Sequence, residues 1–72
     1  MPYATNADLP VSVRAHLPAH AQDIFRAAFN ASFSAHAFDR RREEAARRIA
    51  WAAVKKSYRK EGEAWVAKGE EP

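Results

Sequence analysis

The feature that most constrains the fold is a stretch at residues 19–37 in which apolar residues recur every three or four positions. This spacing places them on one face of an α-helix, which turns once in about 3.6 residues. That face consists of Ala21, Ile24, Phe25, Ala28, Phe29, Ser32, Phe33 and His36, and the opposite face carries Gln22, Asp23, Arg26 and Asn30. The chain is therefore expected to fold around one long amphipathic helix whose phenylalanines belong to the core.

A Leu17-Pro18 corner separates this helix from a shorter one before it. Proline disfavours the helical conformation of the preceding residue but is tolerated in a first turn, so Pro18 ends one helix and can begin the next. We expect the first helix to have Asp8 as its N-cap and Pro10 in its first turn.

A third helix is expected after Asp39, which is a suitable N-cap, and before Gly62, where a left-handed residue would end it. Residues 64–66 are too few for a helix and are expected to form a short strand. The expected partner of that strand is the extended segment 2–5. The predicted fold is a mainly α bundle with a short two-stranded antiparallel ribbon that joins the N- and C-terminal ends. Its three helices are expected at about 9–17, 19–37 and 40–60.

With 72 residues and no cysteine, the chain is expected to form a single domain, 1–72, that packing alone stabilises. Residues 67–72 are expected to be a flexible tail. The predicted core consists of Val13, Leu17, Ile24, Phe25, Phe29, Phe33, Ile49, Val54 and Tyr58.

Positive charge is concentrated in residues 40–60, where nine basic residues stand against only Glu43 and Glu44. On a helix, several of these residues form a stripe roughly 27 Å long on the side opposite the apolar residues. Such a stripe could bind an anionic partner, or it could be a solvated face that keeps a small protein in solution. The candidate residues for an anionic partner are Arg41, Arg48, Lys55, Lys56, Arg59 and Trp51, although Trp51 could instead cover the core.

Catalytic and metal-binding patterns are missing from the sequence. The serines have no Gly-flanked turn, and two glycines are too few for a phosphate-binding loop. His16 and His20 have a metal-ligand spacing, but Pro18 breaks the helix between them. The sequence predicts no enzyme, no cofactor and no metal site.

No apolar run approaches the roughly 20 residues needed to cross a bilayer. Residues 1–8 lack the basic and apolar regions of a signal peptide. A cytoplasmic protein is therefore expected.

Several short fragments, taken in their order and spacing, closely resemble the ChaB family, whose members are described as cation transport regulators. These fragments are Met1-Pro2-Tyr3, Asp8-Leu9-Pro10, Leu17-Pro18-Ala19-His20-Ala21-Gln22-Asp23-Ile24, Ala28-Phe29-Asn30 and Ile49-Ala50-Trp51-Ala52-Ala53-Val54-Lys55, with Tyr58 and Trp65. The resemblance implies a compact helical domain with a small sheet element and brings no catalytic residues.

The resemblance also implies a partner, the cytoplasmic face of a calcium or sodium/proton antiporter. Some relatives look linked to nucleic acid, through fusion to domains that resemble RNA-binding ones and through DNA-binding viral homologues. A module that binds DNA or RNA through the basic face of the third helix is therefore the alternative function. Residues 38–42 depart from the family pattern, because this region is short and carries three arginines in a row. That departure weakens a role for an acidic, cation-sensing loop and favours an anionic partner.

Overall fold

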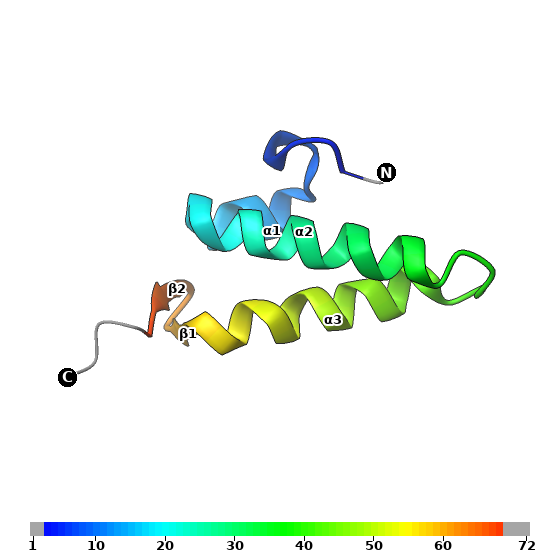
Figure 1. The fold of residues 1–72 in the computed structure, drawn as a ribbon. Coiled ribbons are helices and arrows are strands. Elements are labelled where there is room, and N and C mark those ends of the chain that lie inside the picture. Colours follow the sequence, from blue (N-terminus) through cyan, green and yellow to red (C-terminus); the bar gives the residue numbers. More distant parts are fainter. Residues whose placement is uncertain (1–2, 69–72) are drawn as a thin grey trace.

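The computed structural model describes residues 3–68, and its main body is an antiparallel pair of helices (Figure 1). These are α2 (Ala19–Ala35) and α3 (Arg42–Ser57), joined by a turn at residues 36–41. The short helix α1 (Val11–His16) packs beside α2, after a single 3₁₀ turn, η1 (Asn6–Asp8). The mainly helical class predicted from the sequence is confirmed.

Beyond α3 the chain forms an antiparallel hairpin of two strands, β1 (Tyr58–Glu61) and β2 (Ala64–Ala67). Tyr58 is paired with Ala67, and Glu61 with Ala64, so residues 62–63 form a two-residue loop. Gly62 has a φ of 63° and Glu63 has no positive φ, which is the type II′ pattern with glycine at the first central position.

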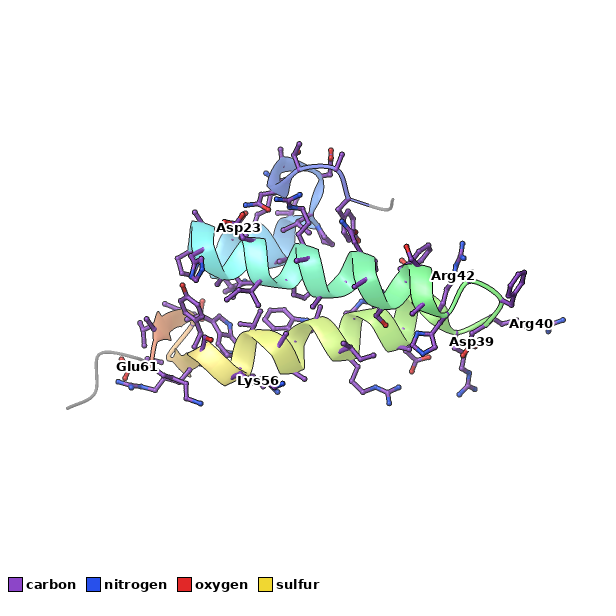
Figure 2. All side chains as sticks on the ribbon, in the orientation of Figure 1. Asp23, Asp39, Arg40, Arg42, Lys56 and Glu61 are labelled. Atoms are coloured by element: carbon purple, nitrogen blue, oxygen red, sulfur yellow. The ribbon has the colours of Figure 1, made fainter. Side chains whose placement is uncertain are left out.

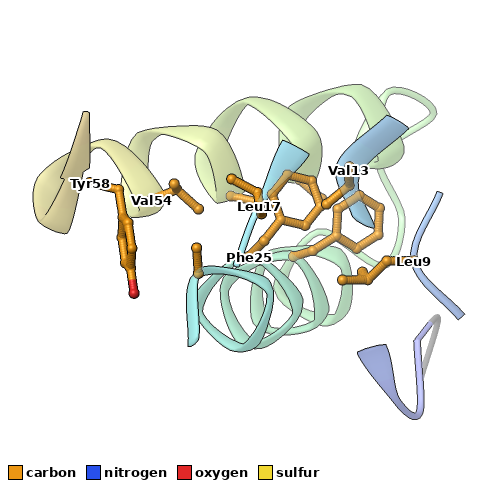
Figure 3. Close-up of a cluster of buried hydrophobic side chains, with 10 residues drawn as sticks. Leu9, Val13, Leu17, Phe25, Val54 and Tyr58 are labelled. Carbon is orange, nitrogen blue, oxygen red and sulfur yellow. The ribbon is translucent and has the colours of Figure 1, made fainter. Parts of the chain in front are cut away.

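The core lies between the three helices, as Figure 3 shows. Phe25 and Phe29 are its large side chains, and Ala46, Ala50 and Val54 meet them along α3 with none of their surface exposed. Small side chains at two consecutive turns let the two helix backbones approach closely. The buried hydrophobic residues are Leu9, Val13, Leu17, Ala21, Phe25, Phe29, Ala46, Ala50, Val54 and Tyr58.

Three core assignments differ from the sequence-based prediction. Ile49 is 44% exposed, because its position on α3 faces away from α2, and Ile24 and Phe33 are only partly buried at the core margin. Leu9 and the two alanines of α3 take their places in the core. Leu9 is buried because the segment that leads into α1 packs against the other two helices. The periodicity of α2 and α3 cannot predict this packing.

The predicted end of the third helix and the predicted partner of the second strand were wrong. The helix ends at Ser57, because Tyr58 adopts an extended conformation and forms a hydrogen bond of 3.0 Å with His20 Nδ1 through its hydroxyl. β2 then pairs with β1 and not with residues 2–5. Of the expected tail, Ala67 belongs to β2 and the Lys68 amide donates to Ser57 O, whereas residues 69–72 lie outside the described part.

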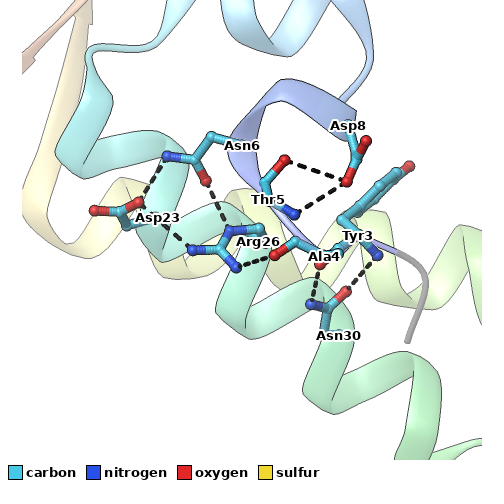
Figure 4. Close-up of polar contacts among 8 residues, drawn as sticks. All are labelled: Tyr3, Ala4, Thr5, Asn6, Asp8, Asp23, Arg26 and Asn30. Atoms are coloured by element: carbon cyan, nitrogen blue, oxygen red, sulfur yellow. Dashed lines mark hydrogen bonds and ion pairs between the residues drawn. The ribbon is translucent and has the colours of Figure 1, made fainter.

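The N-terminal segment is instead held against α2 by side chains that sequence analysis had placed on a free polar face (Figure 4). Asn30 accepts a hydrogen bond from the Tyr3 amide and donates one to the Tyr3 carbonyl, at 3.2 and 2.8 Å. Arg26 donates to Ala4 O and to Asn6 Oδ1. Asn30 lies roughly 15 Å along α2 from the end where the hairpin packs, so the two terminal segments are too far apart to pair.

Both predicted N-caps are displaced. Asp8 lies in η1, where its carboxylate accepts hydrogen bonds from the Thr5 amide and hydroxyl, and Pro10 holds the N-cap position of α1. Asp39 lies two residues before the N-cap of α3, Arg41, and its carboxylate accepts from the Arg41 amide at 2.8 Å. Both aspartates still bind backbone N–H groups near a helix start, as their residue type favours.

Replacement of Phe29 by alanine tests this core. Phe29 is 2% exposed and contacts Phe25, Phe33 and Tyr3 through ring pairs with centroids 4.8 to 6.1 Å apart. We expect Phe29→Ala to lower the free energy of unfolding by about 3 to 5 kcal/mol, a large part of the stability of so small a domain. Urea denaturation followed by circular dichroism measures the change. Phe38→Ala, at a fully exposed phenylalanine, is the control and should leave the midpoint unchanged.

Candidate anion-binding surface

The outward side of α3 carries the predicted basic residues. Arg41, Arg48 and Lys55 are seven residues apart, close to two helical turns, so they point in nearly the same direction. That direction is opposite to Ala46 and Ala50, which are buried against α2. Lys56 also points away from α2 (Figure 2), and Arg59 follows in β1. We call these five residues, Arg41, Arg48, Lys55, Lys56 and Arg59, the basic face.

Four of the five cationic groups have no partner within residues 3–68. The side chains of Arg41, Arg48, Lys55 and Lys56 form no hydrogen bond or ion pair there, and all four residues are exposed. Arg59 differs, because its guanidinium binds the Glu61 carboxylate at 2.7 Å. The structure therefore leaves four of the predicted side chains available to an anion and couples the fifth to a neighbouring acid.

Trp51 does not lie on the basic face. It is half-buried, and its ring meets Phe25 edge-on at a centroid distance of 5.1 Å and Trp65 at 5.5 Å. Trp51 therefore covers the core, which was one of the two interpretations of this residue, while part of its surface faces solvent. It lies beside the outward row of α3, on the side toward α1 and the hairpin.

On that side, Trp51 lines a cavity of about 330 Å³ that opens between α1, α3 and the hairpin. The sequence analysis did not group its residues, which come from three separate parts of the chain. The lining residues are Ser12, His16, Trp51, Lys55, Lys60 and Trp65. Lys55 thus borders both the basic face and this cavity.

The histidines and acids form no metal-binding group in the described part of the chain. No three or more His, Asp or Glu side chains gather there in a way that could hold an ion. His16 donates from Nδ1 to Ser12 O at 2.7 Å, and His20 pairs with the Tyr58 hydroxyl. Across residues 3–68, no helix combines the length and apolar character that a membrane span requires.

Several residues in the family-like fragments have clear structural roles. Gln22 Nε2 donates to Leu17 O at 2.8 Å and so fixes the corner before α2. Asp23 accepts from Asn6 Nδ2 at 2.7 Å, and Asn30 binds the backbone of Tyr3. These fragments hold the fold together, and the exposed basic face is largely separate from them.

The chain is similar to known proteins in sequence and in fold. The profile of the ChaB family matches residues 9–68. Proteins named "Putative cation transport regulator ChaB" from Escherichia coli (strain K12) and Shigella flexneri are each 52% identical over 66 residues, which cover 83% of this chain and 87% of theirs. The NMR solution structure of a protein of the same name is 46% identical, has a TM-score of 0.82, and is matched over 93% of this chain and 99% of its own.

Removal of charge from the basic face should not affect folding. Arg41 and Arg48 are exposed and their side chains have no partner within residues 3–68. We expect Arg41→Gln and Arg48→Gln each to change the free energy of unfolding by less than about 0.5 kcal/mol, as is usual for surface positions without such contacts. Urea denaturation checks this. A larger loss would show that the basic face has a structural role, and these variants would then be unsuitable for binding tests.

Proposed function

The chain belongs to the ChaB family, and on that basis we propose that it is a non-enzymatic regulatory or adaptor protein that acts on a cation antiporter, one that exchanges calcium or sodium for protons. Relatives that are 52% identical carry the name of cation transport regulators. In this proposal the basic face binds an acidic segment that the transporter exposes at the cytoplasmic side of the membrane.

One observation carries the proposal: Arg41, Arg48, Lys55 and Lys56, whose side chains have no partner within residues 3–68, project away from α2 along α3 and its N-cap. Arg41 and Lys55 are 14 residues apart, so the row extends roughly 21 Å along α3. Because the core fixes α3 on its opposite side, the spacing of the charges is set before any partner arrives. A preorganised charged surface favours fast and specific association with a surface of opposite charge.

The same row favours a second candidate function, the binding of DNA or RNA. Regularly spaced arginines and lysines can neutralise successive phosphates, and half-buried Trp51 lies beside them. The two functions differ in the partner that the row binds. Phosphate contacts lose affinity steeply as the salt concentration rises, for any sequence of the nucleic acid.

Charge reversal on the basic face tests the transport proposal. Everted membrane vesicles that contain an overproduced calcium/proton or sodium/proton antiporter are mixed with the purified protein, and a pH-sensitive dye reports cation exchange. We expect the wild-type protein to change the exchange rate. Arg48→Glu combined with Lys55→Glu should lose at least roughly nine-tenths of that effect, because like charges placed across an interface cost several kcal/mol.

The matched control reverses one charge outside the row. Arg40 lies in the turn between α2 and α3 (Figure 2), and Arg40→Glu should keep most of the activity that the Arg48→Glu, Lys55→Glu variant loses. An unchanged exchange rate with wild-type protein would contradict the transport proposal. Fluorescence anisotropy with labelled single-stranded and duplex DNA and RNA over a salt series then tests the second function. Tight binding that the double variant abolishes would support it.

A further inference from the structure

The cavity between α1, α3 and the hairpin combines two kinds of group that the proposed function does not use together. Its walls include both tryptophans of the chain, Trp51 and Trp65. Its rim includes two lysines, Lys55 and Lys60, and the imidazole of His16. Indole faces beside ammonium groups suit a ligand that is itself both aromatic and negatively charged.

We propose that this cavity binds a nucleoside phosphate, either as a free nucleotide or as one nucleotide of a single strand. The base lies against the indoles of Trp51 and Trp65, and the phosphate lies at the ammonium groups of Lys55 and Lys60. This site does not depend on a transporter partner, so the proposal stands or falls separately from the proposed function.

The two indoles are the evidence that the ligand contains a base. The two indoles have their centroids 5.5 Å apart and their planes inclined by 32°, so they form an angled pair and not a closed stack. Trp51 packs against Phe25 in a T-shaped arrangement, and Trp65 is held in β2 opposite Lys60. Both rings are half-buried, so each is fixed in place and keeps some of its surface open. Rigid aromatic faces of this kind are platforms on which a base can stack.

The positive charge around the cavity is the evidence that the ligand contains a phosphate. Within residues 3–68, no acidic residue lines the cavity. Neither Lys55 nor Lys60 forms a side-chain hydrogen bond or ion pair within residues 3–68, so both ammonium groups can turn toward a ligand. His16 uses Nδ1 to bind Ser12 O, which leaves Nε2 for a further contact. Compact ammonium charges on flexible stems are common phosphate ligands.

The size of the cavity limits the ligand. About 330 Å³ is near the lower end of the range for small-molecule sites. That volume suits one base with its sugar and phosphate, and it is small for a folded peptide segment. An inorganic phosphate would occupy the lysine end and leave both indoles without a contact.

Because both tryptophans line the cavity, the protein carries its own reporter. AMP is titrated into the full chain while indole fluorescence is followed at the red edge of its absorption, where adenine does not absorb. ¹H–¹⁵N spectra of the two indole N–H groups are recorded in parallel. We expect saturable changes in both indole signals with AMP, and much weaker ones with adenosine or inorganic phosphate at the same concentration.

Paired charge variants locate the site. Lys55→Gln combined with Lys60→Gln should weaken AMP binding by roughly tenfold or more, because both phosphate ligands are lost. Arg40→Gln combined with Arg48→Gln removes the same charge from exposed positions outside the cavity and should leave AMP binding unchanged. Amide spectra of both variants show that they are folded.

The remaining arms decide between ligands. One outcome is that a short single-stranded oligonucleotide saturates the indole signals at a lower concentration than AMP does. If the Arg40→Gln, Arg48→Gln variant then weakens the binding of the oligonucleotide and not that of AMP, the bound nucleotide is part of a single strand. If AMP binds as well as the oligonucleotide, the source is a free nucleotide. The proposal is overturned if AMP moves neither indole signal, if phosphate alone binds as tightly as AMP, or if an acidic peptide with a tyrosine moves both indole signals where AMP does not.

Discussion

The rest of the structure depends on the close contact between α2 and α3, in which Ala46 and Ala50 receive the rings of Phe25 and Phe29. Larger side chains at the two alanines would push the helices apart and leave the phenylalanines without neighbours. Once this contact is made, the direction of every other side chain on α3 is fixed. The charged residues then have only the outward side available, and the exposed row of the basic face is a consequence of the core.

The parts of the fold that were predicted correctly are those that local periodicity determines. The pattern of α2 was strong enough to give its bounds within two residues, and the Leu17-Pro18 corner separated it from α1. The hairpin was missed because Val54 and Tyr58 continue the helical spacing. What ends the helix is the partly buried hydrogen bond between Tyr58 and His20, which are 38 positions apart. Such a contact leaves no trace in a local pattern, and neither do the contacts of Asn30 and Arg26 with the N-terminal segment.

The same distinction applies to the candidate sites. The row of Arg41, Arg48 and Lys55 could be predicted, since three residues at a spacing of seven must lie along one side of a straight helix. The cavity could not, because its lining comes from α1, from α3 and from a hairpin whose second strand sequence analysis had paired with residues 2–5. Trp65 lies beside Trp51 because β2 turns back along β1. Sites built from one element can be predicted from sequence, whereas sites built from several require the tertiary structure.

Lys55 connects the two surfaces, because it belongs to the basic face and also borders the cavity. Its position is further fixed by Lys68, which donates from Nζ to the Lys55 carbonyl at 3.0 Å. An anion held by the Lys55 ammonium group in the cavity would neutralise part of the charge that the basic face offers to a partner. Thermodynamic linkage requires the effect to be mutual, so a partner bound at Lys55 would lower the affinity for the small anion by the same factor. Two sites that share one cation in a chain of this size are therefore expected to compete, and the charge of a small ligand would oppose the binding of a larger one.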